Sequence, residues 1–106
     1  MSIPNPNMTK SIKLNSTVVR GEGCVGAELS PDETVVLGAD LENYFGFDSV
    51  ASRVWQLVER PMTVDAICSV LMDEFEVDRA TCEAELLEFV NRLASESLVR
   101  VEDEAS

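Results

Sequence analysis

The spacing of hydrophobic and polar residues divides the chain near residue 48. Residues 17–47 contain short runs of β-branched and aromatic side chains, separated by Gly, Pro, Asp and Asn. Such runs favour strands, and the separating residues favour turns. The pattern predicts β structure at residues 17–20, 24–29, 34–37 and 44–47. Two successive hairpins join the last three segments, so we expect a three-stranded antiparallel sheet.

From residue 48 onward, apolar residues recur with the helical period of 3.6. Asp48 or Ser49 is suited to cap a first helix, which Pro61 ends. Thr63 and Asp78 are suited to cap a second and a third helix in the same way. The apolar stripes on these helices are expected to form the core together with one face of the sheet.

The predicted order is three strands followed by three helices, which makes an α+β domain. Residues 76–78 separate the second and third helices, and this is helix-turn-helix spacing. Together with the sheet, the spacing suggests a winged helix-turn-helix fold. We expect the third helix to fray near residues 95–97 and residues 98–101 to pack back on the core. The predicted organisation is a flexible N-terminal tail at 1–15, a folded domain at 16–101 and an acidic C-terminal tail at 102–106.

Charge and missing residue types narrow the function. The 106 residues include 20 acidic and 8 basic side chains, giving a net charge of −12. This charge disfavours nucleic acid and anionic membranes as partners, because both require an excess of Lys and Arg. The chain has no His, and its three Cys form no CxxC pair, so we expect no metal site and no disulfide framework. We identify neither a signal peptide nor an apolar run of membrane-spanning length, and expect a cytoplasmic protein.

Two common functional classes find little support. Catalysis needs a nucleophile with a base, a metal cluster or a phosphate-binding loop, and the Gly21-Glu22-Gly23 segment lacks the Lys-Ser/Thr of such a loop. We therefore expect no enzymatic activity and no cofactor. DNA binding is suggested only by the helix-turn-helix spacing. The third helix carries Arg79 and Arg92 against more acidic residues, namely Asp78, Glu83, Glu85, Glu88 and Glu96, so a major groove would repel it.

An open sheet edge makes peptide binding the best-supported function. A strand at a sheet edge presents unpaired N–H and C=O groups, and an extended peptide can add to it as a further strand. The predicted strand at 44–47 is short and aromatic, and Gly46 leaves space beside Tyr44. Gly46 can also serve sheet twist or a bulge. The same open edge would also allow homodimerisation.

Several segments, taken in order, resemble the PqqD-like family. They are Asp40-Leu41-Glu42-Asn43-Tyr44-Phe45-Gly46-Phe47-Asp48, Val50 to Leu57 with its Val54-Trp55 pair, Pro61-Met62-Thr63-Val64, Glu76-Val77-Asp78, and Cys82-Glu83 with Leu86, Phe89, Val90, Leu93, Leu98 and Val99. The likeness extends over residues 17–101. Each segment alone is mostly core, but their order and spacing together are fairly specific.

The resemblance implies a non-catalytic recognition element for ribosomally synthesised, post-translationally modified peptides. Such proteins bind the leader of a precursor peptide as an added strand and deliver it to a leader peptidase or modifying enzyme. The Tyr-Phe-Gly-Phe strand and the Cys-Glu pair look most like the stand-alone members of lasso-peptide clusters. A peptide chaperone in quinone-cofactor (PQQ) biosynthesis is an alternative, although its usual Asp-Gly is replaced here by Glu59-Arg60-Pro61. A dimeric protein–protein adaptor without a peptide ligand is a second alternative.

The resemblance also implies roles for individual residues. The leader would pair with the third strand and its approach, at Leu41, Glu42, Asn43, Tyr44, Phe45 and Gly46, with Tyr44 as a wall of the groove. The opposite wall would lie on the third helix, at Glu85, Leu86, Phe89 and Arg92. Core positions would be Phe45, Phe47, Trp55, Ile67, Leu71 and Leu93. The helical wheel leaves open which edge of the third helix faces the groove, the one with Glu85 and Phe89 or the one with Leu87 and Ala94.

Overall fold

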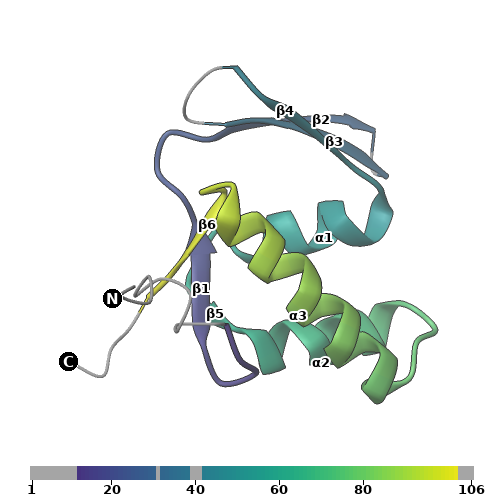
Figure 1. Ribbon diagram of the computed structural model, residues 1–106. Coiled ribbons are helices and arrows are strands. Elements are labelled where there is room, and N and C mark those ends of the chain that lie inside the picture. Colours follow the sequence, from purple (N-terminus) through teal and green to yellow (C-terminus); the bar gives the residue numbers. More distant parts are fainter. Residues whose placement is uncertain (1–11, 31, 39–41, 103–106) are drawn as a thin grey trace, which may run out of the picture.

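The computed structural model describes residues 12–30, 32–38 and 42–102. Within them, antiparallel strands and three helices confirm the predicted α+β class. The elements are β1 (Thr17–Arg20), β2 (Val25–Ser30), β3 (Glu33–Leu37), β4 (Tyr44–Phe47), α1 (Ser49–Leu57), β5 (Met62–Thr63), α2 (Val64–Glu74), α3 (Arg79–Ser95) and β6 (Val99–Val101). In Figure 1, α1 and α3 lie on one side of the sheet that contains β2, β3 and β4.

The strands form two small sheets, so the prediction of a single three-stranded sheet was incomplete. One sheet has the order β2-β3-β4 and is the predicted pair of hairpins. The other has the order β5-β1-β6, and both of its pairings are antiparallel. The strands β5 and β6 have two and three residues. Segments that short have no readable period of their own, and they become strands only because β1 lies between them.

The three predicted N-caps are confirmed. Each side chain accepts a hydrogen bond from the backbone N–H three residues later, at 2.9, 3.1 and 3.2 Å for Asp48, Thr63 and Asp78. Such a bond satisfies one of the helix's unpaired N–H groups. Hydrogen bonds from the Thr81 side chain and backbone hold the pKa of the Asp78 carboxyl below its usual value.

Helix α3 ends in a defined cap instead of fraying as predicted. The N–H of Leu98 donates to the Leu93 carbonyl at 2.9 Å, and that of Ser97 donates to the Ala94 carbonyl at 3.0 Å. These two bonds make a Schellman motif, in which the residue after the cap is left-handed. Ser97 occupies that position with φ of 62°. The turn directs the chain into β6, so the expectation that residues 98–101 pack back on the core is confirmed for Leu98 and Val99, while Arg100 and Val101 are exposed.

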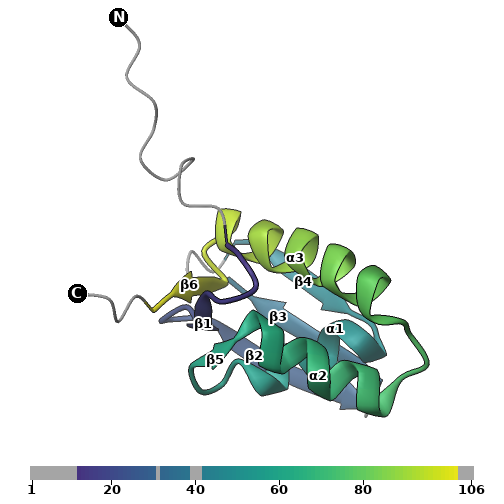
Figure 2. The ribbon, with the colours of Figure 1, turned by 90° about the horizontal axis from the view of Figure 1, so that it is seen from below.

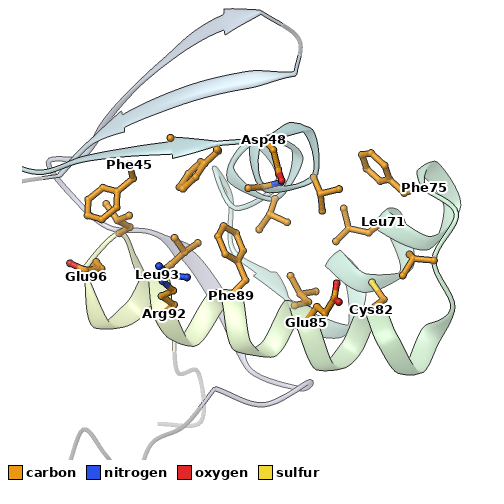
Figure 3. Close-up of a pocket in the computed structure, with 18 of the residues that line it drawn as sticks. Phe45, Asp48, Leu71, Phe75, Cys82, Glu85, Phe89, Arg92, Leu93 and Glu96 are labelled. Atoms are coloured by element: carbon orange, nitrogen blue, oxygen red, sulfur yellow. The ribbon is translucent and has the colours of Figure 1, made fainter.

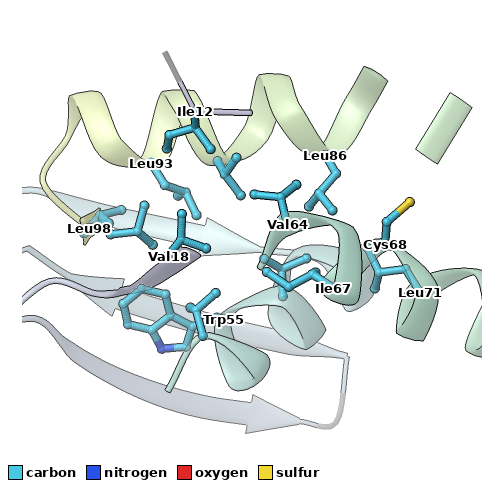
Figure 4. Packing of buried hydrophobic residues seen from close by; sticks show 14 of the residues in the cluster. Ile12, Val18, Trp55, Val64, Ile67, Cys68, Leu71, Leu86, Leu93 and Leu98 are labelled. Atoms are coloured by element: carbon cyan, nitrogen blue, oxygen red, sulfur yellow. The ribbon is translucent and has the colours of Figure 1, made fainter. Parts of the chain in front are cut away.

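The core lies between the β2-β3-β4 sheet and the helices (Figure 4). Trp55 is almost fully buried, and the guanidinium of Arg20 lies 4.5 Å from its ring centroid. A Cβ at residue 26 would lie 2.7 Å from the Trp55 indole nitrogen. Gly26 therefore lets β2 lie directly on the indole. Trp55, Ile67, Leu71 and Leu93 are buried as predicted, while Phe45 is only partly buried.

The N-terminal boundary of the domain lies earlier than predicted. Ile12 is buried in the core, and its N–H donates to the side-chain oxygen of Asn91 on α3 at 3.0 Å. The carbonyls of Leu14 and Ser16 accept from the first two N–H groups of α2. Residues 12–15 are therefore part of the folded domain, and the rest of the predicted tail lies outside the described residues. At the other end, Glu102 donates its N–H to the Thr17 carbonyl at 2.8 Å.

Helix α2 packs against α3, and the two run side by side in Figure 2. A bidentate ion pair joins α1 to α2, with Arg53 Nε and Nη2 at 2.8 and 2.9 Å from the Glu74 carboxylate. The Glu74 carboxylate raises the pKa of Arg53, and the hydrogen bond from Arg53 lowers the pKa of Glu74. This partly exposed pair is a direct side-chain link between α1 and α2.

Candidate functional site

A groove of about 910 Å³ runs between β4 and α3 (Figure 3). Strand β4 forms one wall, α3 forms the other, and the start of α1 and the end of α2 close the floor. The lining residues are Tyr44, Phe45, Gly46, Phe47, Asp48, Val50, Ala51, Val54, Leu71, Phe75, Glu76, Val77, Cys82, Glu85, Leu86, Phe89, Arg92, Leu93, Glu96 and Leu98.

Aromatic contacts join the two walls of the groove. Phe47 is buried, with its ring centroid 5.9 Å from that of Trp55 and 5.7 Å from that of Phe89. The contact with Phe89 is edge-on, at an interplanar angle of 78°, which is a favoured aromatic geometry. Phe45 points toward the groove in Figure 3 and is partly buried. One face of β4 therefore packs against α3 and leaves apolar surface in the groove.

The far edge of β4 has no strand partner among the described residues. β4 pairs only with β3, with Phe45 opposite Val36 and Gly46 opposite Val35. The Gly38 N–H donates to the Asn43 carbonyl at 3.0 Å, so Gly38 and Asn43 form a hydrogen-bonded pair between β3 and β4. In an antiparallel pair, hydrogen-bonded and non-hydrogen-bonded positions alternate. Counting from residue 43, Phe45 directs its main-chain groups to β3.

By the same alternation, the main-chain N–H and C=O groups of Tyr44 and Gly46 point away from β3, toward the free edge. Gly46 is exposed, and a Cβ built on it would have no atom within 4 Å. The space that the sequence predicted beside Tyr44 is therefore present. An extended peptide lying along this edge would meet two residues with both N–H and C=O directed toward it.

The four residues predicted on α3, Glu85, Leu86, Phe89 and Arg92, all line the groove. The structure also decides which edge of the helix faces it. The Asn91 amide donates to the carbonyls of Ile12 and Leu87, so the N-terminal segment covers the opposite edge. The groove edge is thus the one that carries Glu85 and Phe89.

The residues predicted on the β4 side divide into three groups. Tyr44, Phe45 and Gly46 line the groove. Successive side chains in a strand alternate between the two faces, so the ring of Tyr44 lies on the sheet face opposite Phe45. Tyr44 therefore lines the groove with its main chain. Glu42 and Asn43 are exposed in the β3–β4 connection and do not line the groove. Leu41 lies outside the described residues.

Several lining residues were not among the predicted site residues. Leu71, Phe75 and Val77 come from the end of α2 and the turn after it, and Val50 comes from α1. Their sequence signal is that of any apolar helical stripe, so only the packing of α2 against α3 shows that they border a groove.

The charged side chains that line the groove are mostly acidic. Asp48, Glu76, Glu85 and Glu96 line it with a single basic residue, Arg92. Burial and the neighbouring Cys68 raise the pKa of Cys82 to about 12, so this thiol is neutral and a poor nucleophile at pH 7. The described residues contain no group of three or more His, Cys, Asp or Glu placed to hold a metal ion.

Comparisons with known proteins find one matching family and one similar solved structure. Residues 33–99, more than half of the chain, match the family model for coenzyme PQQ synthesis protein D. A solved structure of TbiB1 in complex with the TbiA(beta) leader peptide is similar, with a TM-score of 0.70 and 34% sequence identity. That match covers 83% of this chain and 99% of TbiB1. No curated protein matches the chain.

None of the described helices is both long and apolar enough to cross a membrane.

The family match extends from the start of β3 into β6, and therefore includes both walls of the groove. The chain belongs to the PqqD family.

Proposed function

We propose that this chain is a non-catalytic recognition protein for the leader of a ribosomally synthesised, post-translationally modified peptide. The leader adds as a strand to the free edge of β4 and lies in the groove against α3. The observation that carries this function is the unpaired β4 edge facing an apolar helical wall. The likeness to TbiB1, solved with a leader peptide, supports it.

The dimensions of the groove set the length of the bound segment. Its α3 wall extends from Cys82 to Glu96. At about 1.5 Å per helical residue this wall is about 21 Å long. An extended chain rises about 3.3 Å per residue, so the groove accommodates about six leader residues.

The lining residues specify the chemistry of that segment. Side chains of an added strand alternate between the two faces of the sheet, so every second leader residue enters the groove. These residues meet Phe45, Phe89 and Leu93 and should be apolar or aromatic. The acidic residues listed above favour Lys or Arg at the remaining positions, and this preference affects association rate more than affinity.

The pathway we favour is lasso-peptide biosynthesis, with delivery of the leader to a leader peptidase or other modifying enzyme. The basis is the residue pattern of β4 and of the α3 start, which resembles the stand-alone members. A winged helix-turn-helix reading of α2 and α3 is compatible with this role. It does not imply DNA binding, because α3 carries more acidic than basic residues. No cofactor is required, and we place the protein in the cytoplasm.

The test is binding of fluorescent leader peptides from the same gene neighbourhood, measured by anisotropy, with a DNA duplex as control. We expect sub-micromolar affinity for one leader and no affinity for DNA. A folded protein that binds none of these leaders would contradict the proposal. If the chain instead binds the precursor peptide of the quinone cofactor, we would assign it to the PQQ pathway.

A further inference from the structure

The β2-β3-β4 sheet has a second face that no described element covers. Figures 1 and 2 both show the helices on one side of this sheet only. Apart from Ser30 and Glu33 at the β2–β3 end, the residues that alternate to the other side are apolar or lack a side chain. We call this surface the outer face, and it comprises Val25, Ala27, Val35, Leu37, Tyr44 and Gly46.

The outer face is a continuous apolar surface in solvent. The register places Val25 beside Leu37 and Leu37 beside Tyr44, so that the three form a row across the sheet. Val25 is 59% exposed and Tyr44 71% exposed, and Leu29, at the end of β2, is 64% exposed. Scattered apolar residues at a surface are ordinary, but a contiguous row of this kind marks an interaction surface.

The charges around the outer face indicate what can cover it. Residues 21–52 contain no Lys or Arg, and their acidic residues are Glu22, Glu28, Asp32, Glu33, Asp40, Glu42 and Asp48. Asp32 and Glu33 lie exposed at the β2–β3 turn, and Glu42 lies exposed before β4. An apolar centre with an acidic rim complements a surface with an apolar centre and a Lys/Arg rim. A second copy of this chain would bring acidic rim against acidic rim.

We propose that the outer face docks the enzyme that receives the bound peptide, through a basic-rimmed apolar patch on that enzyme. This inference rests on the proposed function, because it needs a peptide to be delivered. β4 belongs to both surfaces, with its free edge toward the leader and its outward residues toward the enzyme. A partner on the outer face therefore lies beside the bound leader without displacing it from the groove.

The double variant Val25→Lys, Ala27→Lys, at two exposed outer-face positions of β2, tests this surface. Both side chains are exposed on β2, the strand farthest from the leader edge, so the fold should be retained, and circular dichroism checks it. The control is Val101→Lys, an exposed apolar residue of β6 in the other sheet. The probes are a labelled leader peptide that the chain binds and the purified leader peptidase that cleaves this leader.

We expect the double variant to bind the peptidase at least tenfold more weakly, with leader affinity within about twofold of wild type. The control should match wild type in both assays, and wild-type association with the peptidase should slow as salt is raised. Unchanged peptidase binding by the folded double variant would overturn the proposal. So would a wild-type chain that binds leader but not peptidase, or a chain dimer in sedimentation that the double variant dissociates. Peptidase binding without leader binding would instead refute the proposed function.

Discussion

Replacing Gly46 with Pro should weaken leader binding without unfolding the domain. Because hydrogen-bonded pairs alternate along β3 and β4, starting from Gly38 and Asn43, the N–H of Gly46 points to the free edge of β4. It takes no part in pairing with β3. Proline removes this donor, and its ring enters the open space where no atom lies within 4 Å of a built Cβ. The matched control is Gly46→Ala, which adds a Cβ in the same space and keeps the N–H.

The size of the loss follows from one backbone hydrogen bond. A leader carbonyl left without its donor in a partly buried site costs about 1–3 kcal/mol. This corresponds to a rise in Kd of about 5- to 150-fold relative to Gly46→Ala. Proline at Phe45 would differ, because that N–H belongs to the β3 ladder and its loss should lower the free energy of unfolding.

Fluorescence anisotropy with one labelled leader measures both affinities, and urea unfolding checks that both variants are folded. An independent arm leaves the protein unchanged and methylates leader backbone nitrogens one at a time. Strand addition predicts that methylation weakens binding at every second position. If Gly46→Pro is folded and binds as tightly as Gly46→Ala, and if methylation shows no alternation, the leader does not add to β4.

Further predictions concern stability and reactivity. Ser97→Gly should raise the free energy of unfolding by about 0.5–1 kcal/mol in urea, since glycine adopts the left-handed φ without strain. Ser95→Gly, at the last residue of α3, should lower the free energy of unfolding, because glycine loses more backbone entropy on folding. The buried Thr34 hydroxyl has no partner among the described residues, so Thr34→Val should stabilise by about 1 kcal/mol, and a loss in thermal unfolding would mean that it is hydrogen-bonded. Folding raises the pKa of Cys82 from an ordinary 9.0 to about 12, so the unfolded chain loses this proton first. The resulting stabilisation should be complete below pH 9 and disappear as pH approaches 12, and Cys82→Ala should flatten that part of the urea-measured profile.

Local chemistry made part of the fold predictable. The caps at Asp48, Thr63 and Asp78 and the hairpins joining β2, β3 and β4 depend on residues close together in sequence. Such signals act over a few positions, and they were confirmed. The β5-β1-β6 sheet was missed because its strands of two and three residues exist only through pairing between distant segments.

The candidate site was predictable to a similar extent. The resemblance carried by residues 40–48 and 76–99 named both walls, and the predicted α3 residues line the groove. The sequence left the facing edge of α3 open, because Phe89 and Leu87 flank the same apolar stripe. Ile12 decides it by packing beside Asn91, a contact between residues 79 positions apart.

The sequence by itself determined the secondary-structure order, the acidic charge and the identity of the edge strand, since each depends on composition or near neighbours. Only the tertiary structure decided which face of β4 is buried and which main-chain groups remain unpaired. It also decided that none of the described elements covers the outward rows of the sheet. These properties depend on strand register and on where helices pack, and both arise from contacts between residues far apart in the chain.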